Sequence, residues 1–278
     1  VLRLENNPII KKRNLGKYVR KLLKDEKWLF KKKFKNIYLV GGTWRSLLKY
    51  HLFKEKHPLH ILHQYKLSKD LAVKYLNRVS KFNKSSLKSM EYITKSRTPY
   101  LPFSSIILNE IIEAASPSKV ICSISGLREG HMNTIINHGM SEDEIFKLKT
   151  DGISFKKGDY GKSFEKYFNF ISPLFEDNEY FNRRLLTLAC ILSKMDWGLG
   201  AFQKAELVFM EVLNTPLLKL EHKDRVKVAS ASFWRHCGLK YNPDYQFLAL
   251  LNNNEILPSK QVGSALSLAE SLTSMSAL

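Results

Sequence analysis

Strand-like and helix-like patterns alternate through the first half of this 278-residue chain and stop alternating near residue 137. Short apolar or β-branched runs predict strands at 1–4, 37–40, 59–65 and 119–124. Helical spacing of apolar residues fills the segments between these runs, at 15–34, 43–53, 69–82, 103–115 and 126–136. Because strands that alternate with helices form a sheet-centred layer, the first half is expected to be an α/β domain.

The second half contains helical patterns without a convincing strand. Helices are predicted at 164–175, 180–195, 201–213, 224–237, 245–251 and 260–275, and prolines separate several of them. We therefore predict an α/β domain over 1–138, an acidic, glycine-containing linker over 139–161, and an all-α domain over 162–278.

Composition indicates a soluble globular protein, with 44% hydrophobic residues and no apolar run of the length that a transmembrane helix needs. The three cysteines, Cys122, Cys190 and Cys237, stand far apart in apolar surroundings, which favours buried free thiols and a cytoplasmic location. Neither an initiating methionine nor a signal-peptide pattern occurs at Val1, so we expect a fragment or a processed start.

Positive charge is concentrated at the amino-terminal end. Residues 1–100 contain 26 Lys or Arg against 6 Asp or Glu, whereas residues 101–278 contain 19 against 20. Such an excess indicates an anionic partner, for example polyphosphate, a nucleotide or nucleic acid. A lysine-rich composition that reflects an AT-rich genome explains the same numbers, and both interpretations stay open.

The run Ile37–Leu48, IYLVGGTWRSLL, predicts a strand that ends at Gly41-Gly42-Thr43 and a helix that begins at once. Two glycines let the backbone approach a ligand closely, and Thr43 is expected to cap the helix. Free N–H groups at such a helix start attract phosphate. The same pattern also occurs where a turn merely connects a strand to a helix and binds no ligand.

Other polar groups are weaker candidates for chemistry. Four of the eight histidines lie within 51–63, but no Cys or Asp stands at metal-ligand spacing beside them. In the helical half, Asp196 lacks the adjacent histidine that a histidine–aspartate metal site needs. Arg128 and Glu129, in the SGLREG segment 125–130, either touch a substrate or fasten a helix start. No Walker loop, Gly-x-Ser-x-Gly motif or Cys-x-x-Cys pair occurs.

Taken together and in order, several segments resemble the second half of the exopolyphosphatase and guanosine pentaphosphate phosphohydrolase family. They are VLRL (1–4), IYLVGGTWRSLLKYH (37–51), HPLHILHQYKL (57–67), SRTPYLPFSSIILNEII (96–112) and SGLREG (125–130). The helical half resembles the carboxy-terminal domain of alphaproteobacterial members in LACILSKMDW (188–197), AELVFMEVLNTPL (205–217) and EHKDRVKVASASFWRH (221–236).

This resemblance implies the second lobe of an actin-like, ribonuclease-H-like fold, followed by a helical domain of the histidine–aspartate type without its intact metal motif. It implies release of terminal phosphate from inorganic polyphosphate or pppGpp, with Mg²⁺ as cofactor. Gly41, Gly42, Thr43 and Arg45 match the loop and helix that face the substrate cleft, and Arg97 matches a basic position suited to a phosphate contact. A homodimer is implied, with neither a membrane nor a nucleic-acid partner.

The chain also departs from the family pattern. Members of the family carry two phosphate loops in their first lobe, Asp-x-Gly-Ser and Gly-Gly-Gly-Ser, together with a catalytic glutamate. None of these three features occurs in this chain. We therefore expect no catalytic residue and no metal ligand within these 278 residues, and no turnover by this chain alone. A second interpretation is a non-catalytic polyanion-binding protein, in which aromatic residues among the lysines of 27–50 stack on nucleic-acid bases. A third is a regulatory relative that never catalyses.

Overall fold

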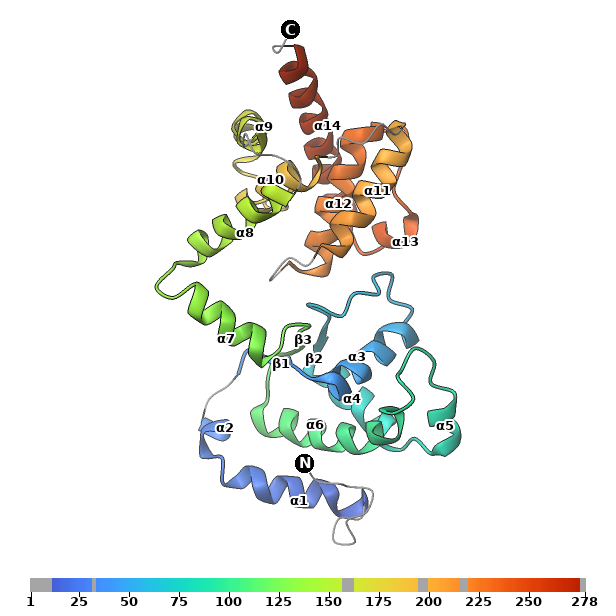
Figure 1. The fold of residues 1–278 in the computed structure, drawn as a ribbon. Coiled ribbons are helices and arrows are strands. Elements are labelled where there is room, and N and C mark those ends of the chain that lie inside the picture. Colours follow the sequence, from blue (N-terminus) through green and yellow to red (C-terminus); the bar gives the residue numbers. More distant parts are fainter. Residues whose placement is uncertain (1–11, 32–33, 157–162, 195–199, 216–219, 276–278) are drawn as a thin grey trace. The chain divides into compact units, whose positions relative to one another are not determined.

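The computed structural model describes residues 12–31, 34–156, 163–194, 200–215 and 220–275 (Figure 1). The chain divides into two compact units, residues 1–133 and 134–278. Unit 1 contains a small mixed sheet with helices, and the described part of unit 2 is helical without strands. The expectation of an α/β part followed by a helical part is confirmed at this level, while the strand expected at 1–4 lies outside the described residues.

Helix α8 (Glu142–Lys156) occupies most of the segment 139–161 that we expected to be a linker. The division into units falls after residue 133, within helix α7 (Leu127–Ile136), rather than at 138. Ser141 and Glu144 explain the helix: the Glu144 carboxylate accepts from Ser141 N–H at 2.7 Å, and Glu144 N–H donates to Ser141 Oγ at 3.3 Å. This reciprocal capping box fixes a helix start that composition alone suggested was a loop.

The sheet of unit 1 has three short strands in the order β1-β3-β2: β1 (Asn36–Leu39), β2 (Lys66–Ser68) and β3 (Lys119–Cys122). β1 runs parallel to β3, with Leu39 opposite Cys122, and β2 runs antiparallel to β3. The carboxyl ends of β1 and β3 therefore meet at the same edge of the sheet. In open α/β sheets this edge is where ligands bind.

The strand expected over 59–65 is wrong, since β2 begins only at Lys66. The His57 side chain folds back on Leu59, whose N–H donates to His57 Nδ1 at 3.1 Å. A turn then closes as Tyr65 N–H donates to the Leu62 carbonyl, and Gln64 has a positive φ of 64°. Local side-chain and turn bonds thus replace strand geometry over most of this segment. Its last two residues still bond to β3, since Gln64 N–H donates to the Cys122 carbonyl at 2.9 Å and Cys122 N–H donates to the Tyr65 carbonyl at 2.9 Å.

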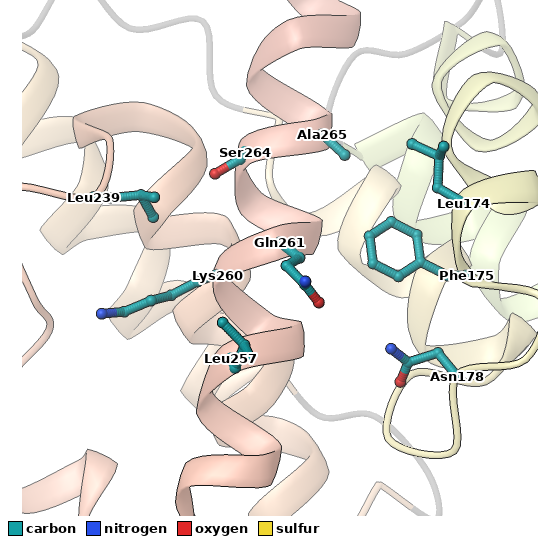
Figure 2. Close-up of a pocket in the computed structure, with 9 residues that line it drawn as sticks. All are labelled: Leu174, Phe175, Asn178, Leu239, Leu257, Lys260, Gln261, Ser264 and Ala265. Atoms are coloured by element: carbon teal, nitrogen blue, oxygen red, sulfur yellow. The ribbon is translucent and has the colours of Figure 1, made fainter.

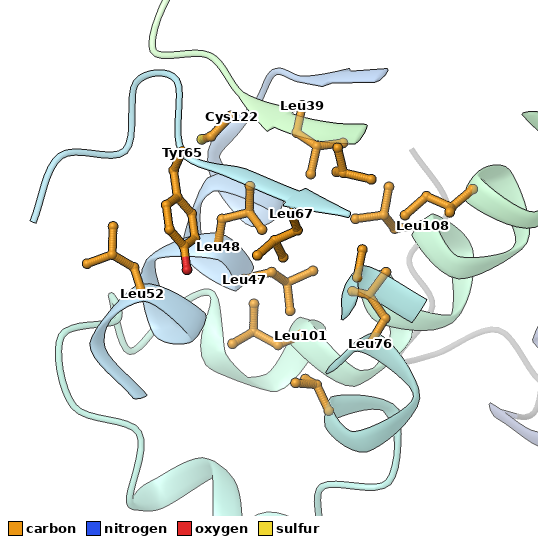
Figure 3. Close-up of a cluster of buried hydrophobic side chains, with 14 of the residues drawn as sticks. Leu39, Leu47, Leu48, Leu52, Tyr65, Leu67, Leu76, Leu101, Leu108 and Cys122 are labelled. Carbon is orange, nitrogen blue, oxygen red and sulfur yellow. The ribbon is translucent and has the colours of Figure 1, made fainter. Parts of the chain in front are cut away.

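The helices of unit 1 supply most of its core, and three of them contribute the leucines that pack against the sheet. Their bounds are α1 (Lys12–Lys24), α2 (Lys27–Lys31), α3 (Gly42–Lys54), α4 (Lys69–Ser80), α5 (Lys84–Lys88), the short 3-10 helix η1 (Thr98–Tyr100), α6 (Leu101–Ala115) and α7. Figure 3 shows how leucines of α3, α4 and α6 meet the sheet: Leu47, Leu48, Leu76, Leu101 and Leu108 lie in one cluster with Leu39, Leu67 and Cys122. This apolar cluster holds the start of α3 against the end of β1.

Unit 2 is built around a buried central helix, α12 (His222–Cys237), which packs against α11 (Ala201–Asn214) and α14 (Asn253–Met275). The remaining elements are α9 (Ser163–Ile171), η2 (Ser172–Phe175), α10 (Arg183–Leu192) and α13 (Tyr245–Leu248). Gly263 lets α14 approach α12 closely, because a Cβ there would lie 2.7 Å from the Ala231 carbonyl oxygen. The helices expected in this half are present within the described residues, but α10 begins at Arg183 rather than at 180, and α13 ends at Leu248 rather than at 251.

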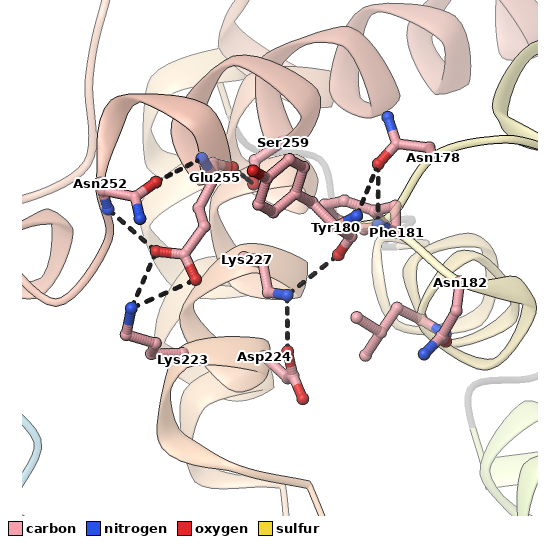
Figure 4. Close-up of polar contacts among 11 residues, drawn as sticks. Asn178, Tyr180, Phe181, Asn182, Lys223, Asp224, Lys227, Asn252, Glu255 and Ser259 are labelled. Atoms are coloured by element: carbon pink, nitrogen blue, oxygen red, sulfur yellow. Dashed lines mark hydrogen bonds and ion pairs between the residues drawn. The ribbon is translucent and has the colours of Figure 1, made fainter.

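Polar contacts fix the amino-terminal half of α12 (Figure 4). The Lys227 ammonium, nearly buried, donates to the Tyr180 carbonyl at 2.9 Å and pairs with Asp224 at 2.6 Å. The Glu255 carboxylate accepts from Asn252 N–H at 3.0 Å, and Asn252 caps the start of α14 in return. This cap starts α14 at Asn253, seven residues before the predicted start at 260, so that Pro258 lies in its second turn.

Candidate phosphate-binding site

The turn between β1 and α3 is the centre of the candidate site. Gly41 adopts φ 116° and ψ 151°, a conformation that is open essentially only to glycine. Gly41 is the N-cap of α3, and its carbonyl accepts from Arg45 N–H at 3.0 Å. No side chain among the described residues caps this helix start. The expectation that Thr43 caps the helix is therefore wrong, because Thr43 lies inside the first turn.

Uncapped N–H groups at the start of α3 carry partial positive charge. The first turn of a helix has N–H groups without intrahelical partners, and here they belong to Gly42, Thr43 and Trp44. The α3 macrodipole adds to their attraction for an anion. At 13 residues, the helix is long enough for this dipole to matter.

Arg97 brings a full positive charge to the same helix start. Its Nη1 lies 3.5 Å from the Gly42 carbonyl oxygen, although the two residues are 55 positions apart in the sequence. A Cβ on Gly42 would stand only 2.6 Å from Arg97 Cζ, so glycine is what permits this approach. Arg97 itself is exposed, and a turn positions it through the bond from Arg97 N–H to the Thr94 carbonyl at 2.9 Å. The guanidinium thus lies beside the turn and is open to solvent.

Arg45 connects α3 to the segment that follows β3. Its Nε donates to the Ser123 carbonyl at 2.9 Å, and its Nη2 donates to the Ile124 carbonyl at 2.8 Å. The role visible in the structure is therefore to position the two loops at the carboxyl edge of the sheet. Direct contact between Arg45 and a substrate stays a prediction.

The SGLREG segment forms the second loop at this edge. Gly126 N–H donates to the Glu129 carboxylate at 2.6 Å, which fastens the start of α7. Hydrogen bonds from the backbone N–H groups of Glu129 itself and of Gly126 lower the pKa of the Glu129 carboxyl. Of the two interpretations weighed for Glu129, the structure supports the helix-fastening one.

All five residues that the family resemblance matched to a substrate site lie in unit 1, and four of them, Gly41, Gly42, Thr43 and Arg45, belong to the turn and the first turns of α3. Arg97 joins them through tertiary packing. Sequence reasoning missed the carbonyls of Ser123 and Ile124 as partners of Arg45. The sequence held only an indirect signal for these two carbonyls. Two parallel strands that are each followed by a glycine-containing turn place both turns at the carboxyl edge of the sheet, where they can meet.

The histidines of 51–63 make packing and hydrogen-bond contacts within unit 1, and His51 and His57 both pack on the Tyr65 ring. His51 is buried, with its Nδ1 2.8 Å from the Tyr65 hydroxyl and its ring edge-on to Tyr75. Burial, more than any neighbouring charge, lowers the pKa of His51 and of His57. In the part of the chain that the structure describes, no group of three or more His, Cys, Asp or Glu is placed to hold a metal ion. Mg²⁺ stays an implication of the resemblance.

The three cysteines show no sign of an activated thiolate. Burial raises the pKa of Cys122 to about 11, that of Cys190 to about 12 and that of Cys237 to about 11. The prediction of buried free thiols is confirmed for Cys122 and Cys190, whereas Cys237 is half-buried. Thiols with such pKa values are protonated near neutral pH and are poor nucleophiles.

Unit 2 contains a separate, mostly apolar cavity of about 430 Å³, which lies beside α14 (Figure 2). Its lining includes Leu174, Phe175, Leu257 and Ala265, with Lys260 at one side. The Lys260 ammonium lies 5.3 Å from the Trp234 ring and is thus engaged in a cation–π contact. Asp196, considered above as part of a metal site, lies outside the described residues.

Comparison with models of known protein families gave no match, and comparison with curated proteins gave none either. None of the described helices combines the length and the apolarity needed to cross a membrane.

Proposed function

We propose that this chain is the phosphate-binding part of a phosphohydrolase that releases terminal phosphate from inorganic polyphosphate or pppGpp. In this proposal unit 1 is the second lobe of an actin-like, ribonuclease-H-like fold, and unit 2 is a helical domain of the histidine–aspartate type without its metal ligands. A homodimer in the cytoplasm belongs to the same proposal. The chemistry is attack by water in line with the scissile bond, where positioning and charge stabilisation provide most of the catalysis.

One observation carries the proposal: the exposed Arg97 guanidinium stands 3.5 Å from the Gly42 carbonyl at the uncapped start of α3. A phosphate at this position would accept from the N–H groups of Gly42 and Thr43 and would face the Arg97 charge. Charge-assisted hydrogen bonds of this kind are the strong ones. Arg45 supports the site indirectly, since it holds the loop after β3 against α3.

The excess of Lys and Arg in residues 1–100 gives the proposal a second support, because a basic surface attracts and orients a long polyanion. The non-catalytic alternative, a polyanion-binding protein, uses the same surface. Both interpretations predict no phosphate release from these 278 residues alone. Release that depends on Mg²⁺ and is abolished by Arg97→Gln would contradict that expectation and place the catalytic groups within this chain.

The proposed site can be tested by measuring the affinity of inorganic polyphosphate for the wild-type chain and two variants over a range of salt concentrations. Arg97→Gln is expected to lower affinity by about tenfold, as the loss of a charge-assisted contact predicts, and to reduce the salt dependence. Arg78→Gln is the matched control, because Arg78 is an exposed arginine of α4 in the same unit. Equal losses in both variants would show that general basic charge, not the Gly42 site, binds the polyanion.

A further inference from the structure

Three aromatic rings form a stack on the surface of unit 1. The Tyr92 ring lies on the Phe53 ring with centroids 4.0 Å apart and planes only 5° apart. The His60 ring also contacts the Phe53 ring, with centroids 4.4 Å apart and planes tilted by 42°. Tyr92 is 59% exposed, so one ring face is covered by Phe53 while much of the side chain is open to solvent.

Tyr92 has an unusual backbone conformation and a buried neighbour. Tyr92 has a positive φ of 66°, a conformation that aromatic residues rarely adopt. The next residue, Ile93, is buried in the core cluster of unit 1 and anchors the segment. A ring that is both fixed and exposed loses little conformational entropy when a planar ligand stacks on it.

The stack and the proposed phosphate site lie at opposite ends of the same helix. Gly42, Lys49 and Phe53 follow one another at helical spacing on α3, and about 16 Å of helix separates Gly42 from Phe53 at 1.5 Å per residue. The segment Tyr92–Arg97 runs along this helix, because Tyr92 contacts Phe53 and Arg97 contacts Gly42. A nucleoside that carries a chain of several phosphates can span this separation.

The charge around the stack favours an anionic ligand. The two segments that build it, residues 49–60 and 84–97, contain seven Lys or Arg against two Glu. The Lys49 ammonium lies over the Phe53 ring, 5.9 Å from its centroid, and Lys49 itself stands between Gly42 and Phe53 in the sequence of α3. This positive charge disfavours a cationic ligand. A planar base attached to phosphates can stack on the ring while its phosphates are attracted by the lysines.

We propose that the exposed face of Tyr92 stacks with the purine base of a nucleoside polyphosphate whose phosphates lie at the start of α3. This inference rests on the proposed phosphate site, and it makes Tyr92 the residue that distinguishes a nucleotide from polyphosphate, which has no base. Lys49 lies along the path and contacts the intervening phosphates. Affinity for nucleotides then depends on both Tyr92 and Arg97, which lie at the two ends of the binding site. Affinity for polyphosphate depends on Arg97 but not on Tyr92.

The experiment measures the affinity of the 278-residue chain for two probes, GTP and inorganic tripolyphosphate, by isothermal titration calorimetry. Tyr92→Gly removes the ring and tolerates the positive φ, so the fold is retained; circular dichroism checks this. It is expected to lower GTP affinity about tenfold and to leave tripolyphosphate affinity unchanged, because base stacking contributes about 1–3 kcal/mol. Tyr92→Phe keeps the ring and is expected to bind GTP like the wild type. Tyr38→Thr, which removes another exposed tyrosine of unit 1, is the matched control.

Unchanged GTP affinity in Tyr92→Gly would overturn the stacking proposal and leave the phosphate site intact. Equal losses of affinity for GTP and tripolyphosphate would also overturn it, because Tyr92 would then support phosphate binding instead of stacking on a base. If the wild-type chain binds neither probe, the proposed function fails with it. Tighter binding of a single-stranded oligoribonucleotide than of GTP, with the same dependence on Tyr92, would assign the stack to nucleic acid and overturn the nucleotide proposal.

Discussion

The Arg97 guanidinium lies against the backbone of Gly42, with Nη1 3.5 Å from the Gly42 carbonyl oxygen. This relationship joins a turn after the first strand to a turn before α6, and it requires a residue without a Cβ at position 42. The neighbouring Gly41 is required for a different reason, its backbone conformation. Substitutions at the two glycines should therefore have separable consequences.

Gly42→Ala should weaken polyphosphate binding without unfolding the protein. The added Cβ would lie 2.6 Å from Arg97 Cζ, and the exposed, flexible Arg97 side chain moves away. Because alanine favours helix, stability should stay the same or rise by up to about 1 kcal/mol. Affinity should fall to the level of Arg97→Gln, and the double variant should lose nothing further. Additive losses in this double-mutant cycle would show that Gly42 and Arg97 act independently.

Gly41→Ala should destabilise unit 1 by about 1–3 kcal/mol, since alanine is strained at φ 116°. Steric crowding adds nothing, because a Cβ at Gly41 would have no neighbour within 4 Å. Urea denaturation monitored by circular dichroism measures this loss. An unchanged midpoint would mean that the turn has a second, alanine-compatible conformation.

Gly263→Ala should destabilise unit 2 by about 1–3 kcal/mol through overpacking. The new Cβ would lie 2.7 Å from the Ala231 carbonyl oxygen and 2.9 Å from Trp234 Cβ, so α12 and α14 would have to separate. Gly152→Ala, in α8 of the same unit, is the control, because its Cβ would enter open space. It should stabilise by about 0.5–1 kcal/mol through helix propensity. Equal effects at both sites, measured by urea denaturation, would contradict the close helix contact.

Much of the secondary structure follows from local patterns. The apolar run at 37–40 and the β-branched run at 119–124 form β1 and β3 because each packs against the core beneath the helices. The segment 59–65 does not form a strand, since side-chain bonds of His57 and a turn at Gln64 compete with sheet pairing. Helix α8 carried a readable signal in Ser141 and Glu144, which the acidic, glycine-containing composition obscured.

The candidate site is only partly visible in the sequence. The double glycine predicts a tight turn before a helix, and this prediction needs only residues that are neighbours in the sequence. Contact between Gly42 and Arg97 depends on how α6 and the segment before it pack, which periodicity does not specify. Arg97 was singled out through the family resemblance. The Tyr92–Phe53 stack was missed, because a positive φ at a tyrosine has no sequence signature.

The stability of unit 1 should fall as the pH drops from about 6.5, the usual histidine pKa in an unfolded chain. Burial lowers the pKa of His51 and of His57 in the folded state, so the unfolded chain binds more protons in this range. Stability is therefore complete above pH 6.5 and declines below it, at most by about 1.4 kcal/mol per pH unit for each histidine. Urea denaturation between pH 7.5 and about 5 measures the slope, in a range above most carboxyl pKa values.

His51→Gln should reduce this slope, because glutamine occupies the position without titrating and its amide can still meet the Tyr65 hydroxyl that lies 2.8 Å from His51 Nδ1. The residual slope should come largely from His57, so the double variant with His57→Gln should be flatter still. His131→Gln, at an exposed histidine of α7, is the control for the general effect of replacing a histidine by glutamine. A wild-type slope in His51→Gln would show that protonation of His51 is not resisted by the fold.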